Sequence, residues 1–285
     1  MTVATDANPT LARRELSVYF RTLREQHGFS VGRLAEVLGV AQSQASRLDT
    51  GARNFRDQDV RQLCELYGLG SEERGRLLAI AEESRMRAWW QQVELLDSYR
   101  TLIGLEQGAL VIHEFCAGAI PGLLQTRSYA EAAARDSQMG AKEADIRRGV
   151  DVRIRRQRLL ERPEPPEMSF IVDEAALARG AGTADTMREQ FQHLVDLSRR
   201  PEITIQIIGF EEGVYPGHVG QFILLRMSRG LPDVYYTEDQ LNTSDTTDVD
   251  AVEAARHLWG LLRARALSPR KSVERITEYR DRLDR

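Results

Sequence analysis

Residues 30–51 constrain the fold more strongly than any other part of the chain. Their apolar side chains fall on one face of each of two short helices: Leu34, Ala35 and Leu38 in the first, Ala45 and Leu48 in the second. Gly39 lies between the helices, where a tight turn favours glycine, and Ser30 is placed to cap the first helix. Ala35 is small, as it must be where two helices cross closely. The pattern predicts a helix-turn-helix.

The exposed face of the second helix carries side chains that suit the major groove of DNA. Opposite Ala45 and Leu48 lie four polar residues: Gln42, Ser43, Ser46 and Arg47. Glutamine can bond adenine edges bidentately, arginine can bond guanine edges in the same way, and serine accepts several bases. Backbone N–H groups and three further side chains are placed for phosphate contact: Gln44, Arg53 and Asn54. We therefore predict double-stranded DNA as a partner, although any packet of four helices also places polar residues outside.

The charge distribution agrees with a nucleic-acid partner. Residues 10–62 hold nine arginines against six acids, a net charge of +3, whereas the whole chain has a net charge of −4. The remaining residues therefore carry −7. Binding to nucleic acid depends on local rather than total charge, so a mildly basic N-terminal module on an acidic body is compatible with it.

Helical patterns surround this segment and end near residue 108. Short apolar faces separated by glycines predict an all-α domain over residues 10–82. Its fifth helix begins near Leu77 and is expected to continue through Trp89 and Trp90 toward Leu105. Residues 83–108 are therefore predicted to form a connecting helix.

The pattern changes at residue 109. Five apolar or alternating stretches predict short strands: 109–117, 167–172, 202–210, 220–227 and 233–238. Helical patterns lie between and after them: 127–136, 141–160, 186–199, 250–266 and 269–283. The predicted fold class is mainly α with α+β. It comprises an N-terminal all-α helix-turn-helix domain followed by an α+β domain over residues 109–285, with a small sheet of about five strands.

The sequence offers no support for an enzyme or a bound cofactor. The five histidines lie far apart and share no metal-ligand spacing with Cys64 and Cys116. Neither a glycine-rich phosphate motif nor a nucleophile elbow is present. No apolar run approaches the ~20 residues that span a bilayer, and two cysteines in so long a chain suit a reducing compartment. We expect a cytoplasmic protein without catalytic activity, metal or cofactor.

Two resemblances refine this prediction. Residues 42–51 are similar to the recognition helix of Xre/Cro-type repressors, with Asp49 where a glutamate is usual. This resemblance implies that an arginine of the first helix, here Arg24, pairs with that acid. The downstream sequence resembles the actinobacterial Scr1-family antitoxin-like transcriptional regulators, in which an Xre domain precedes a domain of unknown function. The motifs that carry this resemblance are, in order, Trp89-Trp90, 105–109, 120–126 with Tyr129-Ala130, Arg153 with Arg156-Gln157, 173–175, Arg200-Pro201, 220–225 and 235–238.

The second resemblance implies a regulator that binds a small protein encoded by a neighbouring gene. Two surfaces of opposite charge are candidates for that partner, and the first is the arginine-rich helix over residues 147–162. We favour the second, an acidic stretch with an aromatic centre, because charge mainly sets encounter rate while affinity usually needs a buried apolar core. Its residues are Tyr235, Tyr236, Glu238, Asp239, Leu241, Asp248 and Asp250.

Alternatives stay open for the second domain. The arginine-rich helix is also explained as a solvated helix paired with acids such as Asp151 and Glu161. The domain can instead be a small-molecule sensor, with a pocket between its sheet and its helices. Helix-turn-helix proteins commonly pair two units about one helical turn of DNA apart. We therefore expect a symmetric homodimer, with the C-terminal domain or the Trp89-Trp90 helix at the interface.

Overall fold

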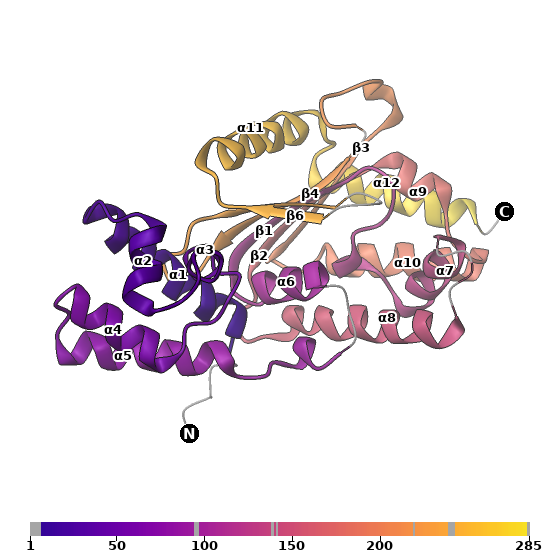
Figure 1. Ribbon diagram of the computed structural model, residues 1–285. Coiled ribbons are helices and arrows are strands. Elements are labelled where there is room, and N and C mark those ends of the chain that lie inside the picture. Colours follow the sequence, from indigo (N-terminus) through magenta and orange to yellow (C-terminus); the bar gives the residue numbers. More distant parts are fainter. Residues whose placement is uncertain are drawn as a thin grey trace. The chain divides into compact units, whose positions relative to one another are not determined.

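The computed structural model describes residues 7–93, 97–137, 140, 142–218, 220–238 and 243–283. Its contacts divide the chain into two compact units, which the colours of Figure 1 let the reader follow along the sequence. The first unit comprises Met1–Gly108 and Ser228–Leu231, and the second comprises Ala109–Met227 and Pro232–Arg285. A short segment of the first unit thus interrupts the second unit in sequence.

The first unit is helical. Its elements are α1 (Pro9–Gln26), α2 (Val31–Leu38), α3 (Gln42–Asp49), α4 (Asp57–Leu66), α5 (Ser71–Arg85), the 3₁₀ turn η1 (Trp89–Gln91) and α6 (Asp97–Glu106). The apolar faces of α1 to α5 meet in one core that contains Leu16, Phe20, Leu34, Leu48, Leu63 and Leu77. Helices as short as α2 and α3 are marginal alone, so this shared burial, worth roughly 1.5–3 kcal/mol per large side chain, stabilises them.

Helices α2 and α3 form the predicted helix-turn-helix. The Ser30 hydroxyl accepts a hydrogen bond from the Arg33 N–H at 3.1 Å and so caps α2. Gly39 ends α2 in the left-handed region at φ 61°, a conformation that costs an L side chain about 1–2 kcal/mol. The Val40 N–H then donates to the Ala35 carbonyl at 3.0 Å, which closes the turn.

The prediction of a continuous connecting helix over residues 83–108 is wrong. Helix α5 ends at Arg85, and the backbone of Met86 is extended, with ψ 151°. The Gln91 side chain accepts from the Ala88 N–H at 3.2 Å and so starts a separate turn, η1, that contains Trp89 and Trp90. The apolar spacing that suggested one long helix belongs to three separate elements, α5, η1 and α6. A side-chain cap can begin a new helical turn without any change in the hydrophobic pattern.

The second unit is built on a six-stranded sheet with the strand order β3-β2-β1-β4-β5-β6. The strands are β1 (Ala109–Cys116), β2 (Glu167–Asp173), β3 (Ile203–Ile208), β4 (Gln221–Met227), β5 (Val234–Glu238) and β6 (Thr243–Thr246). Strands β1, β2 and β3 run parallel, and β4, β5 and β6 add antiparallel pairs beyond β1. The α+β prediction is confirmed, but its count of about five strands missed β6, whose sequence Thr-Ser-Asp-Thr has no apolar residue.

Helices cover both faces of the sheet. They are α7 (Arg127–Ser137), α8 (Glu143–Arg156), α9 (Glu174–Arg179), α10 (Ala184–Leu197), α11 (Val249–Arg265) and α12 (Pro269–Arg282), with 3₁₀ turns η2 (Gly122–Leu124), η3 (Gln157–Glu161) and η4 (Phe210–Glu212). Helix α11 lies on one face, and α7, α8 and α10 lie on the other side (Figure 1). The β3 edge is covered as well, since Ser272 of α12 accepts from the Ile207 N–H at 2.9 Å.

The strand register decides which side chains lie beneath α11. His113 pairs with Leu224 and Phe115 pairs with Phe222, so these four side chains project from one face. The apolar members of that face pack on α11 in one cluster that contains Phe115, Phe222, Leu224, Ala255, Trp259 and Leu262. His113 is the polar exception in this row.

Candidate functional site

The outer face of α3 is a row of exposed polar side chains. Ala45 and Leu48 point into the core and are 0% and 1% exposed. The exposed residues of the helix are Gln42, Ser43, Gln44, Ser46 and Arg47. Because α3 is short and its apolar side is fully used in packing, the opposite side is available along its whole length to enter a groove.

The Arg24–Asp49 pair implied by the resemblance is present. The Arg24 Nε and Nη2 atoms donate to the two Asp49 carboxylate oxygens at 2.7 and 3.0 Å. Both side chains are close to nine-tenths buried, so this is not an exposed surface pair. The Asp49 carbonyl also accepts from the Ser17 hydroxyl at 2.6 Å and from the Arg21 Nε at 2.8 Å. Three side chains of α1 therefore hold the C-terminal end of α3.

The two residues beyond α3 that were predicted to contact phosphate differ in their surroundings. Arg53 is half-buried, and its N–H donates to the Arg47 carbonyl at 3.0 Å, which holds this loop against the end of α3. Asn54 faces inward, since its Nδ2 donates to the Ser84 carbonyl at 3.1 Å and its Oδ1 is buried. The Asn54 amide joins this loop to the end of α5, so a phosphate contact would require that hydrogen bond to break.

The distinctive block at residues 120–126 is held by buried side chains of the second unit. Gln190, which is 0% exposed, accepts from the Thr126 N–H at 2.7 Å and donates to the Leu124 carbonyl at 2.8 Å. Gln157 donates to the Gly122 carbonyl at 3.0 Å and to the Gln125 carbonyl at 2.7 Å. These bonds satisfy the polar backbone of an irregular loop, so the motif has an architectural role.

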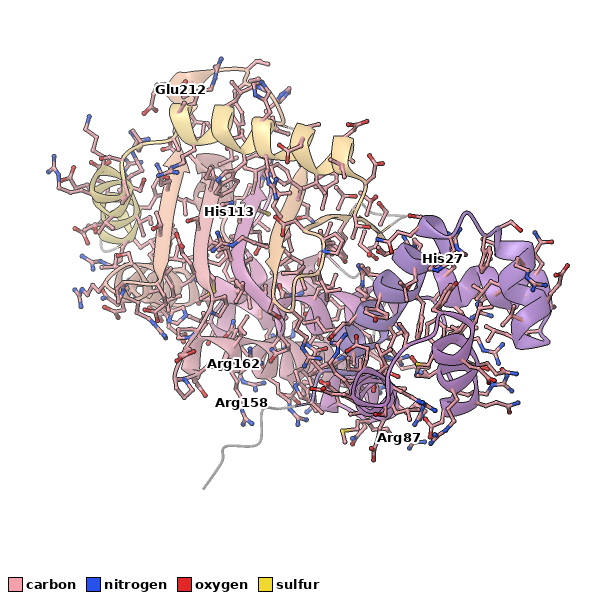
Figure 2. All side chains as sticks on the ribbon, turned by 90° about the vertical axis from the view of Figure 1, so that its left-hand side faces the viewer. His27, Arg87, His113, Arg158, Arg162 and Glu212 are labelled. Carbon is pink, nitrogen blue, oxygen red and sulfur yellow. The ribbon has the colours of Figure 1, made fainter. Side chains whose placement is uncertain are left out.

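The arginine-rich segment does not present one continuous basic surface. Arg156 is buried at 4% exposure, and Arg153 donates to the Gln125 side chain at 2.7 Å. Arg148 pairs with Asp145 at 3.0 Å, while Asp151 is taken by Arg127 at 2.7 Å. Figure 2 shows two further arginines of the segment, Arg158 and Arg162, far from α11. The segment therefore combines internal arginines, paired surface arginines and other exposed arginines such as Arg147 and Arg158, as expected for a helix that packs on one side.

The predicted acidic partner surface is only partly exposed. Tyr236 is 2% exposed, which corrects the prediction that it supplies contact area, because its side chain belongs to the interior of the unit. Tyr235 is half-buried and packs on Phe222 with ring centroids 5.9 Å apart. The acidic residues Glu238, Asp248 and Asp250 are exposed, and the Asp248 carboxylate caps α11 by accepting from the Ala251 N–H at 3.0 Å. Asp239 and Leu241 lie outside the described residues.

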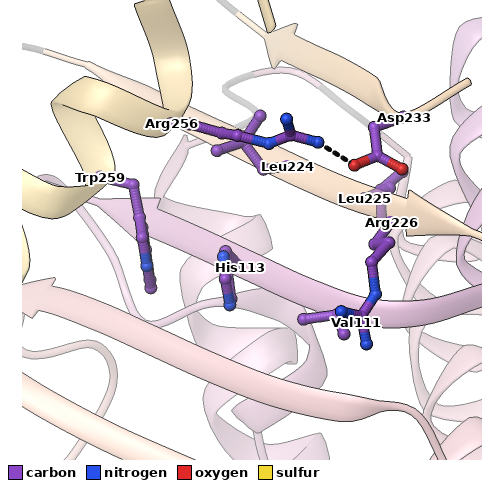
Figure 3. Close-up of a pocket in the computed structure, with 8 residues that line it drawn as sticks. All are labelled: Val111, His113, Leu224, Leu225, Arg226, Asp233, Arg256 and Trp259. Atoms are coloured by element: carbon purple, nitrogen blue, oxygen red, sulfur yellow. Dashed lines mark hydrogen bonds and ion pairs between the residues drawn. The ribbon is translucent and has the colours of Figure 1, made fainter. Parts of the chain in front are cut away.

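A cavity of about 390 Å³ lies in the second unit between the sheet and α11. It is lined by Val111, His113, Leu224, Leu225, Arg226, Asp233, Arg256 and Trp259 (Figure 3). The His113 and Trp259 rings stack in parallel, with centroids 4.6 Å apart and an interplanar angle of 3°. Arg256 forms an ion pair with Asp233, whose other oxygen accepts from the Met227 N–H at 3.2 Å.

The charges at this cavity are mostly positive. Burial lowers the pKa of His113, Glu167 opposes that shift, and Arg263, Arg226 and Arg256 add to it. The imidazole is therefore neutral at pH 7. Arg226 makes no hydrogen bond or ion pair with the residues that the structure describes. The sequence prediction named none of these lining residues as site residues, although Arg226 continues the row of Phe222 and Leu224 at a position where an apolar residue is expected.

The two units define the class of this protein as a helix-turn-helix protein with an α+β second domain. The chain belongs to the family described as "Domain of unknown function (DUF5753)", whose model matches residues 99–278. A model described as "Helix-turn-helix domain" matches residues 15–77, which indicates a DNA-binding regulator. Comparisons with curated proteins and with solved structures give no match. No described helix is both long enough and apolar enough to cross a membrane.

Proposed function

We propose that this protein is a sequence-specific transcriptional regulator that reads the major groove with α3. The observation that carries the proposal is the exposed row Gln42, Ser43, Ser46 and Arg47 on a helix whose opposite side is fixed in the core. We assign no catalytic step to either unit, and we propose that the protein lies in the cytoplasm together with the DNA that it binds.

The test begins with an operator selected from random duplexes by the full chain. Arg47→Ala is expected to cost about 1–3 kcal/mol on that operator and to relax base preference at one position. Arg33→Ala serves as the matched control, because Arg33 is an exposed arginine of α2 already paired with Glu36 at 3.0 Å. Full affinity and unchanged preference in Arg47→Ala would remove α3 as the reading helix.

Arg53 is proposed to contact phosphate rather than bases. Arg53→Ala should weaken operator and unrelated DNA by similar factors, and should reduce the slope of log K against log salt by about 0.9. A loss of affinity confined to the operator would contradict this assignment.

We also propose that the protein binds operator DNA as a symmetric homodimer. One helix-turn-helix reads only a few base pairs, and two units spaced by one helical turn combine their affinities. Sedimentation of the full chain, alone and with a duplex that carries two half-sites, measures the stoichiometry. A monomer under both conditions would overturn the pairing.

The antitoxin-like role, in which a small protein encoded next to this chain binds the second unit, is proposed for the acidic surface formed by Glu238, Asp248 and Asp250. Charge reversal at Glu238 and Asp250 is expected to slow association with that protein and to weaken its salt dependence. Asp248 is left intact because it caps α11, and Asp281→Arg, at an exposed residue of α12, is the control. Unchanged association kinetics in the reversed variant would place the partner elsewhere.

A second candidate function for the same unit is small-molecule sensing. The observation that favours it is the cavity beneath α11, whose volume lies within the range of ligand sites. A small-molecule sensor differs from a partner-binding protein in one measurable property: binding of its ligand must change its affinity for DNA.

A further inference from the structure

We propose that the cavity beneath α11 binds a planar aromatic carboxylate of one or two rings, with the ring against His113 and the carboxylate on Arg226. The inference rests on the second candidate function above and names its ligand class.

The register of the sheet builds the floor of this site. Val111 pairs with Arg226 and His113 pairs with Leu224, so these four side chains form a block on one face of two neighbouring strands. Val111 and Leu224 are buried, whereas Arg226 is exposed. The floor therefore offers apolar contact with a cation at its border, which is the arrangement that an amphiphilic anion requires.

Helix α11 supplies the wall. Arg256 and Trp259 are three residues apart, so both project from the same side of the helix toward the sheet. Trp259 covers one face of the His113 ring. In Figure 3 Arg226 and Val111 lie on the side of His113 away from Trp259, so the second face of the imidazole is turned toward these two lining residues. A planar ring placed there would extend an existing aromatic stack.

The two lining arginines are not equivalent. Arg256 is neutralised by ion pairs with Asp233 and Glu253, so it acts as a fixed part of the wall. Arg226 has no such partner among the described residues, and its guanidinium matches a carboxylate bidentately. The lining carries two arginines and one aspartate, a net charge of +1, and Arg263 adds to the positive field at His113. An anion is therefore favoured over a cation.

The volume sets the size of the ligand. A cavity of about 390 Å³ lies near the lower end of the range of about 300–1,000 Å³ that small-molecule sites occupy. One or two fused rings with a carboxylate fit this space.

Isothermal titration of the full chain with four matched probes tests the chemistry. The probes are naphthoate, its neutral amide naphthamide, the cation aminomethylnaphthalene and the saturated decalin carboxylate. We expect saturable binding of naphthoate with one site per chain, at least about tenfold weaker binding of the amide and of the saturated acid, and no binding of the cation. Equal binding of acid and amide, or no saturation by naphthoate at millimolar concentration, would overturn the proposal.

Variants test the placement. Arg226→Gln should weaken naphthoate at least about tenfold, whereas Arg263→Gln, an exposed arginine of α11 outside the lining, should change it less than about twofold. Because Arg226 is exposed and makes no internal bond with described residues, its replacement is expected to leave the fold intact. Equal effects of the two substitutions would reduce the role of Arg226 to general charge and overturn the assignment.

Operator binding is measured on the same preparations, so that the separate failures are distinguishable. Loss of ligand binding with operator binding retained overturns the pocket assignment alone. Absence of sequence preference in the wild type overturns the DNA-binding proposal and leaves the pocket assignment standing. Binding of naphthoate without any change in operator affinity supports the pocket and overturns the sensor candidate.

Discussion

The buried pair between Arg24 and Asp49 predicts how strongly the reading helix depends on α1. Replacing Asp49 by leucine removes both carboxylate oxygens that accept from Arg24 and leaves a guanidinium that is only 12% exposed. The perturbation lies at the last residue of α3, so it acts on the orientation of the helix and leaves its outer face unchanged.

The structure sets the size of the effect. Removing one member of a fully buried pair costs about 3–5 kcal/mol, because the other charge is left without compensation. Arg24 keeps two other partners after the substitution, the Phe29 carbonyl at 2.9 Å and the Glu25 carboxylate at 3.1 Å. We therefore expect Asp49→Leu to cost about 2–3 kcal/mol, below the full penalty. Combining it with Arg24→Met replaces the pair by apolar groups, and the double variant should regain at least half of that loss.

Hydrogen exchange of the amides in α3 measures the loss of stability of this helix directly. A local measurement is needed because a chain with two units need not unfold in a single two-state transition. The opening free energy of the Ala45–Leu48 amides should fall by about 2–3 kcal/mol in Asp49→Leu and recover in the double variant. The Glu36→Leu variant, at an exposed residue of α2, is the control. A change below about 0.5 kcal/mol in Asp49→Leu, the range of an ordinary surface substitution, would refute the reasoning.

Two further predictions concern the second unit. Gln190→Leu should lower the free energy of unfolding by roughly 2–5 kcal/mol, since it leaves the Thr126 N–H and the Leu124 carbonyl without partners. The control is Glu189→Leu, at an exposed residue of the same helix. Equal urea midpoints for the two variants would contradict the prediction. Acidification should also destabilise the unit, because burial lowers the pKa of His113 below its ordinary 6.5. Between the lowered pKa and 6.5, the unfolded chain holds a proton on this histidine that the folded chain lacks. The free energy of unfolding therefore decreases as pH falls through that window. Urea titrations at several pH values, followed by tryptophan fluorescence, should show a shallower loss in His113→Phe, and an unchanged pH dependence there would contradict the assignment.

The helix-turn-helix could be predicted in detail from the sequence because all of its determinants are local. Glycine at φ 61°, a serine cap and two apolar faces lie within residues 30–51, and each acts over three or four positions. The outer face of α3 followed directly, since the exposed side of a short helix is fixed once Ala45 and Leu48 are assigned to the core. The strands β1 to β5 were also predictable, because each is a short apolar or alternating stretch.

The remaining features depend on contacts between distant residues. The four polar residues of β6 form a strand because β5 is its template, with Tyr236 paired to Asp245. The same sheet buries Tyr236, although the sequence prediction placed it at the surface because acidic residues follow it in the chain. The cavity combines residues of β1 with residues of β4 and α11 that lie more than a hundred positions further along the chain, and these residues share no motif. Only the register reveals that His113, Leu224 and Arg226 meet on one face.

The 120–126 block forms a recognisable sequence motif and the cavity lining does not, because the two parts of the unit need different kinds of side chain. An irregular buried loop has backbone donors and acceptors at fixed places, so particular glutamines at particular positions are needed to pair them, and this yields a recognisable motif. A cavity wall needs only shape and a few charges, which many side chains can supply. The residues that identify the sequence are therefore those that hold the unit together. The residues that we propose to select a ligand are Arg226 and its neighbours beneath α11, and Arg226 itself pairs no backbone group among the described residues.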